Sequence, residues 1–456
     1  MKGRCKGLII SEEIATVMDI LQQNGYEAFL VGGFVRDSIM QKNADDADLT
    51  TDATPEEMLE LFKDYRTLTT GIKHGTITVI INHKPFEITT YRTEMGYSDC
   101  RHPDKVAFAK NIEDDLSRRD FTINSIAYNP IKGYIDPFCG RKDIEDKIIR
   151  CVGEPKKRFS EDSLRILRAL RFASVLGFSI DGETEKAMYE CKELLSHISK
   201  ERIFTELSKM LCGKNIREIL TEYSDILAVV LPEIKAMKNF EQHNFHHIYD
   251  VLNHTAVVVE STPPVLHLRL SALFHDSGKP DCFSLDENGI GHFYSHASIS
   301  AKKAEEALLR LRCDNKTKEK VIKLIKLHDA PIEESEVIIK KKLSKYGEDL
   351  FFDLIELKRA DTKGLAPEFH SRESHFDALV SIANRILSEK PCFSLKNLAI
   401  NGNDLAELGF SGREIGNCLK ILLNEVIENK LDNEKSTLLT KAKNIHYTLY
   451  CCDKMS

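Results

Sequence analysis

The sequence predicts an α+β fold, in which a mixed sheet flanked by helices occupies residues 1–150 and helices form the remainder. Strand-like stretches are confined to the first part of the chain: Tyr26–Val31 is apolar and aromatic, and Thr76–Ile81 and Pro85–Arg92 are β-branched. From Asp143 onward almost every stretch has helical character. Strands followed by a long run of helices are typical of an α+β chain.

The turn after the first expected strand contains Gly32 and Gly33, and Val35–Met40 behind it has helical character. Two glycines leave no side chain between the backbone and a ligand, and the N–H groups of a first helical turn point outward. Arg36 adds a planar cation that suits phosphate oxygens. The order of strand, glycines and helix therefore predicts a phosphate-binding turn.

Asp46 and Asp48 follow this turn, and residues two apart on a strand face the same side. Two such carboxylates repel each other unless a cation lies between them, and hard oxygen ligands suit Mg²⁺. In a two-metal site, such a pair holds the ions that activate a hydroxyl and steady a leaving pyrophosphate. A solvated acidic turn is the alternative. Glu87 could face the same side as a third carboxylate, or it could be an ordinary surface or structural glutamate.

Local signals predict several further elements. Residues 9–24 are expected to form an amphipathic helix, and Thr54-Pro55 is a typical start of another. Residues 94–103 are rich in glycine, proline and polar residues and are expected to form a loop. Residues 118–128 are expected to form a helix on which Asp120 and Asn124, one turn apart, project together.

The stretch Arg158–Phe172 is expected to be a single helix with Asp162 and Arg165 as neighbours on one face. Surface ion pairing is one interpretation. The alternative is a base reader, because an aspartate accepts and an arginine donates hydrogen bonds. Cytosine and adenine present an amine donor beside a ring-nitrogen acceptor, whereas uracil and guanine present the reverse and would leave buried groups unpaired. Arg168 and Arg171 extend the same stripe.

The composition describes a globular protein of several domains. The chain has 456 residues, of which 42% are hydrophobic and 30% charged. It has no apolar run of bilayer length and no signal-peptide pattern, and its 12 cysteines are scattered, so we expect a cytoplasmic protein without a membrane partner. The net charge of -7 argues against indiscriminate nucleic-acid binding, but one local basic run exists. This run contains Arg141, Lys142, Lys147, Arg150, Lys156, Lys157, Arg158, Arg165, Arg168 and Arg171.

Several motifs occur in a characteristic order: Gly32–Asp37, then Asp46 with Asp48, then Arg118–Asn124, Asp136–Gly140 and Glu161–Phe172. Together they closely resemble class II tRNA nucleotidyltransferases, the family of the bacterial CCA-adding enzymes and poly(A) polymerases. The resemblance implies a polymerase-beta-type nucleotidyltransferase head at residues 1–150 and a helical neck and body with the base-reading helix at 151–237. It also implies a helical tail at 366–456 that grips tRNA.

The resemblance implies roles for the motif residues. The catalytic carboxylates that hold Mg²⁺ would be Asp46 and Asp48. The residues that contact the nucleotide would be Gly33, Arg36, Arg119, Asp120, Asn124, Asp162, Arg165, Arg168 and Arg171. Of these, Asp162 and Arg165 would read the base. Arg202 and Glu206, in a later motif, are expected to brace the base-reading helix.

The implied reaction is the template-independent transfer of CMP and AMP from CTP and ATP to the 3′ end of tRNA, with release of pyrophosphate. Family members that add only the two cytidines look shortened at the loop 94–103, which this chain keeps. This difference favours full CCA addition or addition of the terminal A alone. A poly(A) polymerase acting on general RNA is a further alternative, although the strongly basic extension of those enzymes is not seen.

A second set of residues lies within residues 238–365: His254, His275, Asp276, His296, His328 and Asp361. In this order they resemble an HD phosphohydrolase domain. The resemblance implies one metal held by His254, His275, Asp276 and Asp361, and a second site completed by His296 and His328. Such ligands suit Mn²⁺, Fe²⁺, Co²⁺ or Ni²⁺, and the metal would activate water toward a phosphate ester.

A phosphate monoester or a 2′,3′-cyclic phosphate on a damaged tRNA end is the expected substrate of this second site. A decayed or purely structural helical insert is the alternative. A phosphohydrolase whose head only positions RNA is the competing view of the whole chain. The sequence does not indicate the oligomeric state, the metal of the second site or the control of nucleotide order.

Overall fold

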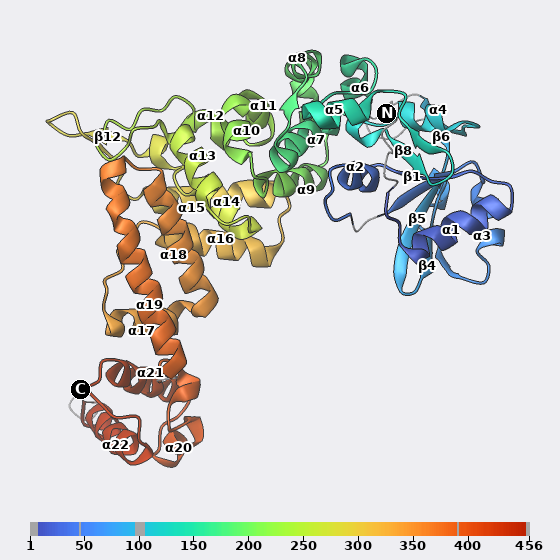
Figure 1. The fold of residues 1–456 in the computed structure, drawn as a ribbon. Helices are drawn as coiled ribbons and strands as arrows, with labels where there is room; N and C mark the ends of the chain where they lie inside the picture. Colours follow the sequence, from blue (N-terminus) through green and yellow to red (C-terminus); the bar gives the residue numbers. More distant parts are fainter. Residues whose placement is uncertain (1–7, 45–46, 96–104, 390–391, 453–456) are drawn as a thin grey trace. The chain divides into compact units, whose positions relative to one another are not determined.

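The structure is a computed structural model that describes residues 8–44, 47–95, 105–389 and 392–452 (Figure 1). The chain divides into two compact units. Unit 1 comprises residues 1–235 with 310–313, and unit 2 comprises residues 236–309 with 314–456. The finer division into head, neck, phosphohydrolase domain and tail stays a prediction.

Unit 1 begins with a seven-stranded mixed sheet, which confirms the predicted α+β class. Strands β2 and β5 pair in parallel, and the other neighbours are antiparallel. In spatial order the strands are β3 (Arg66–Leu68), β4 (Thr76–Ile81), β5 (Lys84–Thr90), β2 (Asp48–Thr51), β1 (Ala28–Val31), β8 (Ala127–Asn129) and β9 (Gly133–Ile135). All four residues of β1 are buried, so this strand lies in the core of the sheet.

Helices α1 (Glu12–Gln23) and α3 (Pro55–Leu61) pack on the sheet and on each other (Figure 1). Helix α1 lies within the predicted range 9–24. Helix α3 begins with a capping box, in which Thr54 and Glu57 satisfy each other's backbone N–H groups. The predicted loop 94–103 begins as strand, because β6 (Arg92–Met95) pairs with β7 (Lys105–Phe108). Residues 96–103 of that loop lie outside the described part of the chain.

The helix predicted over residues 118–128 is wrong. The stretch contains only a short 3-10 turn, η2 (Thr122–Asn124), and then strand β8. Its residues 120–128 are buried throughout, and the backbone of Asp120 and Thr122 bonds to Val152 and Arg150. Pairing of this backbone with a distant segment therefore overrides the helical spacing of Asp120 and Asn124.

The single helix predicted over residues 158–172 is also wrong, because it is broken in the middle. Helix α6 (Pro155–Glu161) ends at Asp162, whose backbone is extended, and α7 (Leu164–Phe172) starts two residues later. The carboxylate of Asp162 accepts a hydrogen bond from the N–H of Leu164 at 3.2 Å. An aspartate that bonds to the backbone two residues on competes with the helix, which explains the break.

The remaining elements are mainly helical. In unit 1 they include α2 (Gly33–Ile39), α4 (Ile112–Ser117), α5 (Gly140–Asp146), α8 (Gly182–Cys191), α9 (Lys200–Leu211), α10 (Ile216–Glu222) and α11 (Ser224–Val230). Helix α7 packs against α9, and α6 packs against α8.

Unit 2 is almost wholly helical. Its long helices are α13 (Val251–Ser261), α14 (Leu266–Phe274), α15 (His296–Arg310), α16 (Asn315–Leu327), α17 (Glu336–Tyr346), α18 (Glu348–Lys363), α19 (Glu373–Glu389), α21 (Arg413–Ile427) and α22 (Lys435–Cys452). Helices α13, α14, α16 and α18 pack against one another. A small hairpin of β12 (Ser284–Leu285) and β13 (Gly291–His292) projects from these helices (Figure 1). Among the described helices, none is long and apolar enough to cross a membrane.

Candidate functional sites

The turn between β1 and α2 brings together a carboxylate and a guanidinium from distant parts of unit 1. Gly32 has φ +72°, a conformation that residues with a side chain rarely adopt. A Cβ atom at this position would lie 3.3 Å from Nη1 of Arg119 and 3.9 Å from Oδ2 of Asp48. The missing side chain therefore leaves the space where these two charged groups approach the backbone.

Two carboxylates lie side by side on the sheet at this turn. Asp48 is the first residue of β2, and the parallel register places it opposite Glu87 on β5. Both residues are exposed, and facing residues of paired strands project from the same side of a sheet. Oxygen ligands of this kind suit Mg²⁺, so the residues present fit the predicted ion. Asp46, its predicted partner, lies outside the described residues.

A chain of charged and amide groups links the head to α7. Arg36 donates two hydrogen bonds to Asp37, at 2.9 and 2.8 Å, and one to Oδ1 of Asn124 at 2.6 Å. Asn124 donates to Asp120 at 3.2 Å, and Asp120 accepts from Nε of Arg168 at 2.7 Å. Four predicted nucleotide-binding residues are thus brought together. Arg36 is already engaged within the protein, so contact with a phosphate would require it to exchange or share these partners.

Asp120 is held ionised by this network. Its burial alone would raise the pKa, but the charge and hydrogen bond of Arg168, with Arg165 nearby, lower the pKa to about 2. In return, Asp120 raises the pKa of Arg168. Both groups therefore stay charged over the physiological pH range.

Asp115 is a buried anchor that the sequence analysis missed. It is 0% exposed and pairs with Arg118 at 2.7 Å and Arg119 at 3.2 Å. In the sequence, Asp115 precedes two arginines by three and four residues, which could have indicated this pairing. However, Asp115 lies in a run of acidic residues, and such a run is usually exposed. This contact positions the guanidinium that faces Gly32.

The predicted base-reading residues are held separately rather than paired with each other. Oδ2 of Asp162 accepts from Arg202 on α9 at 2.8 Å. Arg165 donates to Glu161 at 3.1 Å and to the carbonyl of Arg118 at 3.1 Å. No side-chain contact between Asp162 and Arg165 is found in this described segment, so the surface ion pair between them is not formed.

Glu206 contacts two arginines of α7, and Arg202 contacts Asp162 between α6 and α7. The bracing role predicted for both residues stays a prediction. Glu206 is 5% exposed and approaches Arg171 at 3.1 Å and Arg168 at 3.8 Å. The guanidinium of Arg171 also lies 4.1 Å from the centre of the Phe172 ring. Helix α9 therefore supplies one carboxylate to the charged face of α7 and one arginine to the break before α7.

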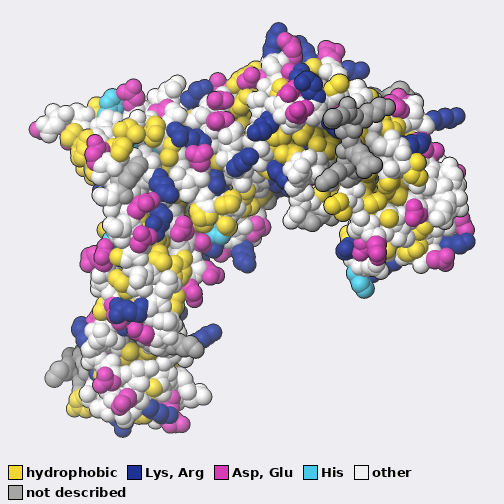
Figure 2. Space-filling model, viewed as in Figure 1, with side chains coloured by type: hydrophobic (Ala, Val, Ile, Leu, Met, Phe, Trp, Pro, Cys, Tyr) yellow, Lys and Arg dark blue, Asp and Glu magenta, His cyan; other side chains and the backbone are white. Residues whose placement is uncertain are grey.

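The basic run 141–171 is largely balanced by carboxylates. The pairs are Lys142–Asp146, Arg150–Asp143, Arg150–Asp181, Lys156–Glu190, Arg158–Glu161, Arg165–Glu161, Arg168–Asp120 and Arg171–Glu206. On the face drawn in Figure 2, Lys and Arg side chains are intermingled with Asp and Glu. The sequence run is thus not a uniform basic patch.

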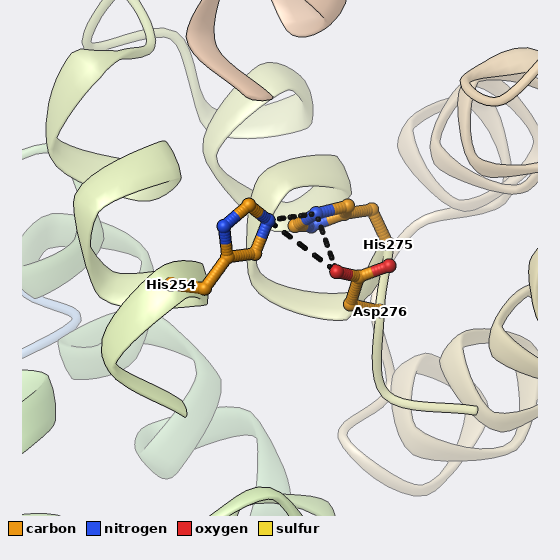
Figure 3. A group of neighbouring side chains, drawn as sticks. All are labelled: His254, His275 and Asp276. Carbon is orange, nitrogen blue, oxygen red and sulfur yellow. Dashed lines mark hydrogen bonds and ion pairs between the residues drawn. The ribbon is translucent and has the colours of Figure 1, made fainter. Parts of the chain in front are cut away.

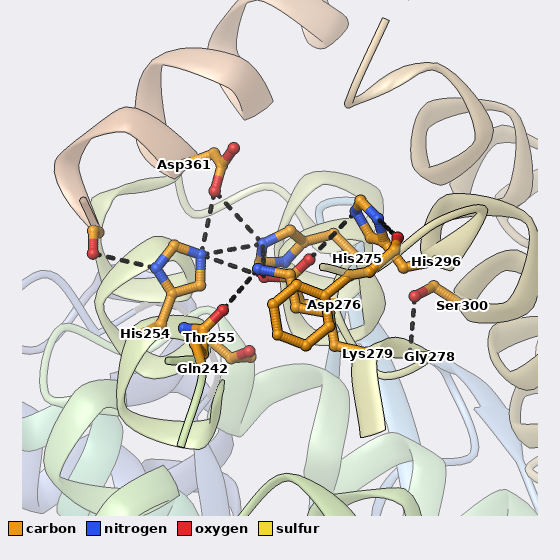
Figure 4. A network of polar contacts seen from close by, with 12 residues as sticks. Gln242, His254, Thr255, His275, Asp276, Gly278, Lys279, His296, Ser300 and Asp361 are labelled. Atoms are coloured by element: carbon orange, nitrogen blue, oxygen red, sulfur yellow. Dashed lines mark hydrogen bonds and ion pairs between the residues drawn. The ribbon is translucent and has the colours of Figure 1, made fainter. Parts of the chain in front are cut away.

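In unit 2, five predicted metal ligands from five segments gather around the sixth, Asp276. Figure 3 shows His254 and His275 beside Asp276, and Figure 4 adds His296 and Asp361. His254 lies on α13, His275 and Asp276 directly follow α14, and Asp361 lies on α18. Nε2 of His254 is 3.3 Å from Nε2 of His275, 3.4 Å from Oδ2 of Asp276 and 3.0 Å from Oδ1 of Asp361. These four groups surround one point.

The other two histidines approach the second oxygen of the same aspartate. His296 begins α15 and His328 directly follows α16. Their Nε2 atoms are 3.2 Å apart, and they lie 3.5 and 3.9 Å from Oδ1 of Asp276. Asp276 therefore belongs to two groups that could each hold a metal ion, His254–His275–Asp276 and Asp276–His296–His328.

All four imidazoles are oriented by the backbone in the same way. Nδ1 of His254 donates to the carbonyl of Gly364 at 3.0 Å. The other three donate to carbonyls three residues before them, from His275 to Ala272, from His296 to Phe293 and from His328 to Ile325, at 2.7, 2.9 and 2.7 Å. A donating Nδ1 leaves the lone pair on Nε2, which is the arrangement that metal-binding histidines adopt.

The charge distribution favours a cation. Burial opposes protonation of His275, but Asp276 and Asp361 raise its pKa to about 10, so without a metal ion Nε2 carries a proton that a bound metal ion would displace. Oδ2 of Asp276 is buried and has no hydrogen-bond partner, although Nζ of Lys279 lies 2.7 Å away. The same oxygen lies 3.4 Å from Nε2 of His254 and 3.3 Å from Nε2 of His275, so this donor set fits a divalent metal ion.

A cavity of about 410 Å³ opens beside this cluster, lined by Asp276, His296, His328 and Asp361 among others. Lys279 and Gln242, which bond each other at 2.7 Å, were not singled out from the sequence. His292, which also stands in the predicted segment, is outside the cluster and bonds Asp286 at 3.0 Å.

Three family models match successive parts of the chain. They are "Poly A polymerase head domain" at residues 28–150, "Probable RNA and SrmB- binding site of polymerase A" at 177–238 and "tRNA nucleotidyltransferase domain 2 putative" at 283–442. The first covers the sheet and the paired carboxylates, and the last covers much of unit 2.

Similar proteins extend this finding to the whole chain. The CCA-adding enzyme of Lactobacillus helveticus is 44% identical over 227 residues, which are 50% of this chain and 56% of that protein. The CCA-adding enzyme of Streptococcus gordonii is 32% identical over 441 residues, which are 95% of this chain and 97% of that protein. The crystal structure of the Bacillus stearothermophilus CCA-adding enzyme in complex with CTP covers 96% of this chain and 98% of its own, with 27% identity and a TM-score of 0.72.

The alignment with the Streptococcus gordonii enzyme covers the sheet, the helices that follow it and unit 2. The similarity is therefore not limited to one shared domain. With the Streptococcus gordonii enzyme aligned over 97% of its length, the chain belongs to the CCA-adding enzymes, a family of nucleotidyltransferases.

Proposed function

We propose that this chain is a class II enzyme that transfers CMP and AMP from CTP and ATP to the 3′ end of tRNA. The observation that carries the proposal is the juxtaposition of Asp48, Glu87 and Arg119 at the Gly32 turn. Carboxylates for a metal and a guanidinium for phosphate are the groups that nucleotidyl transfer needs. We place the reaction in the cytoplasm, where tRNA and nucleoside triphosphates are found.

In this proposal Asp48, with Asp46, holds Mg²⁺, and Glu87 is the third carboxylate beside them. Mg²⁺, when bound, lowers the pKa of the attacking 3′-hydroxyl and neutralises charge on the phosphates. Arg119 lies against the glycine turn, where it can meet phosphate oxygens. Asp120 and Asn124 contact the ribose side, and Asp120 keeps Arg168 in place.

Asp162 and Arg165 read the base in this proposal. Each oxygen of Asp162 has one bond from the protein side, to Leu164 or Arg202, and retains a lone pair for an amine donor. Arg165 donates three hydrogen bonds, to Glu161 and to the carbonyls of Arg158 and Arg118, which are fewer than its five N–H donors. An acceptor and a donor held apart in this way match the edge shared by cytosine and adenine, and they reject uracil and guanine.

The test supplies purified protein with CTP alone and a tRNA that lacks its terminal triplet. Two incorporated cytidines are expected, and Asp48→Ala should abolish incorporation while tRNA binding survives. Asp64→Ala, which removes an exposed carboxylate from the same unit, is the matched control. Incorporation of AMP only would indicate an A-adding enzyme, and long homopolymers on general RNA would indicate a poly(A) polymerase.

The base-reading role has its own test. Asp162→Ala and Arg165→Ala should relax discrimination against UTP and GTP by about tenfold or more, since an unpaired buried polar group costs about 1–3 kcal/mol. Arg141→Ala, an exposed arginine of the same basic run, is the control. Unchanged discrimination in the first two variants would remove the base-reader argument.

We propose a second activity for unit 2, metal-dependent hydrolysis of a phosphate ester by an HD-type domain. It is supported by the four Nε2 atoms and the shared carboxylate of Asp276. Mn²⁺, Ni²⁺, Co²⁺ or Fe²⁺ suits such ligands and would activate water. A 2′,3′-cyclic phosphate or a monoester on a damaged tRNA end is the proposed substrate, because its removal would clear the terminus for the head.

Phosphate release with Mn²⁺ or Ni²⁺ tests this second activity. His275→Ala and Asp276→Ala should lose it, and His267→Ala should keep it, because His267 pairs with Asp353 away from the cluster. Absence of metal-dependent release from every phosphoester tried would show that the cluster is structural.

A further inference from the structure

An exposed pair of stacked rings lies on the cavity beside the metal-ligand cluster. Tyr294 is 73% exposed, and its ring stacks on His292 with an interplanar angle of 7° and 5.4 Å between ring centres. Both residues line the same cavity as Asp276 and His296. A parallel pair at a polar cavity is more specific than a single surface aromatic residue.

The backbone ties this pair rigidly to the ligand cluster. Ser295, between Tyr294 and His296, has φ +63°, a strained conformation for a residue with a side chain. The carbonyl of Phe293 accepts from both the backbone N–H and the Nδ1 of His296. The segment that orients one ligand therefore also fixes the position of the Tyr294 ring.

His292 gives the ring pair its second support. Its Nε2 bonds Oδ2 of Asp286 at 3.0 Å across the β12–β13 hairpin. This bond fixes the plane of the imidazole, so the tyrosine ring is stacked on a fixed surface while its outer face remains exposed. An exposed aromatic face at a cavity binds a nucleobase by stacking, whichever base it is.

A cation completes the cavity. Arg372 is exposed and lines the same cavity, and its guanidinium lies 5.2 Å from the centre of the Phe369 ring. The cavity volume of about 410 Å³ falls within the range of small-molecule sites. In this one cavity, the aromatic pair fits a base, the guanidinium fits a phosphate oxygen, and the metal-ligand cluster fits the phosphate group that reacts.

We propose that Tyr294, supported by His292, is a specificity-determining residue of this cavity, where it stacks on the base of a nucleoside phosphate. The inference rests on the proposed phosphohydrolase function and adds the residue that selects a nucleoside ester over the ester of a simple alcohol. The nucleoside phosphate can be free or can form the end of an RNA chain.

The protein contains no tryptophan, so Tyr294→Trp introduces a unique fluorophore at the platform. Adenosine 2′-monophosphate should quench its fluorescence saturably, and glycerol 2-phosphate should not. Tyr447→Trp is the matched control, since Tyr447 is 74% exposed and lies on α22. Absence of quenching, equal quenching by glycerol 2-phosphate, or the same response in Y447W would overturn the inference.

A hydrolysis arm separates the two proposals. With Mn²⁺, Tyr294→Ala should raise the KM for adenosine 2′,3′-cyclic phosphate about tenfold and leave glycerol 1,2-cyclic phosphate unchanged, as loss of one base–aromatic stack predicts. An equal effect on both substrates would overturn the inference. If wild-type protein cleaves neither ester, the phosphohydrolase proposal fails, and the quenching result still decides whether Tyr294 holds a base.

The source of the nucleoside phosphate is distinguished by one more probe. A CCA trinucleotide carrying a terminal 2′-phosphate should quench Y294W at lower concentration than the mononucleotide if an RNA end is the natural ligand. Equal concentrations would indicate a free nucleotide. Either result supports the stacking role, whereas quenching by neither compound refutes it.

Discussion

Replacing Asp120 with asparagine should destabilise unit 1, because it removes the charge that pairs with Arg168 while keeping the shape of the side chain. A pKa of about 2, against the ordinary value of 3.8, corresponds to about 2 kcal/mol of stability at neutral pH. For a unit of this size, we expect the melting temperature of D120N to fall by about 4–8 °C. Differential scanning calorimetry of the full chain at pH 7 measures the change.

The pH dependence provides the sharper test. The folded-state pKa of Asp120 lies below its unfolded value, so its stabilisation is present above pH 3.8 and is lost as the pH falls through about 2. The difference between wild type and D120N should shrink to roughly half by pH 3. Asp64→Asn, an exposed aspartate of the same unit, controls for net charge. A pH-independent difference, or none at pH 7, would refute the reasoning.

Three further substitutions probe other contacts. Gly32→Ala should lower triphosphate affinity in an ATP titration and cost about 1–2 kcal/mol in a melting experiment, because residue 32 has φ +72°; unchanged affinity would mean that the turn does not face the nucleotide. Gly364→Ala should reduce the Mn²⁺ bound per chain, measured by metal analysis, since the added Cβ would lie 2.5 Å from Nδ1 of His254; full metal content would contradict this role. Arg202→Met should reduce the selectivity for CTP and ATP over UTP and GTP about tenfold in competition assays, because it releases Asp162. Unaltered selectivity would show that Asp162 is held in place without Arg202.

Local chemistry made several elements of the head predictable. Thr54 caps α3 through its own side chain. On either side of a short turn, β4 alternates buried with half-buried residues, and β5 alternates buried residues with exposed or half-buried ones. The pairing of Asp48 with Glu87 was foreseen only as one of two alternatives, because register between distant strands is set by the whole sheet.

The failures occurred where distant contacts decide the local structure. The stretch 118–128 has a helical spacing of Asp120 and Asn124, and these residues do meet, at 3.2 Å, but in a compact turn rather than on a helix. The stretch 158–172 keeps an uninterrupted apolar pattern across Asp162, so only the side-chain bond to Leu164 reveals the break. The roles of the site residues themselves stay predictions.

In unit 2, the resemblance predicted which residues gather in the cluster, but not how their side chains are oriented. Sequence spacing does not tell which ring nitrogen of a histidine meets a carbonyl, since that depends on the end of each helix. Asp115 and Lys279 were missed for a related reason. Charged residues are usually exposed, and their burial depends on partners that only the folded chain supplies.

Because α6 and α7 are separated by a break, the two proposed base-reading residues are held by different neighbours. Asp162 is fastened to α9 through Arg202, whereas Arg165 is fastened to α6 and to the carbonyl of residue 118. A small slide of α9 along α7 would move the acceptor and leave the donor where it is. If Asp162 and Arg165 read the base, substitutions between α7 and α9 would therefore change nucleotide preference without changing either of these two residues.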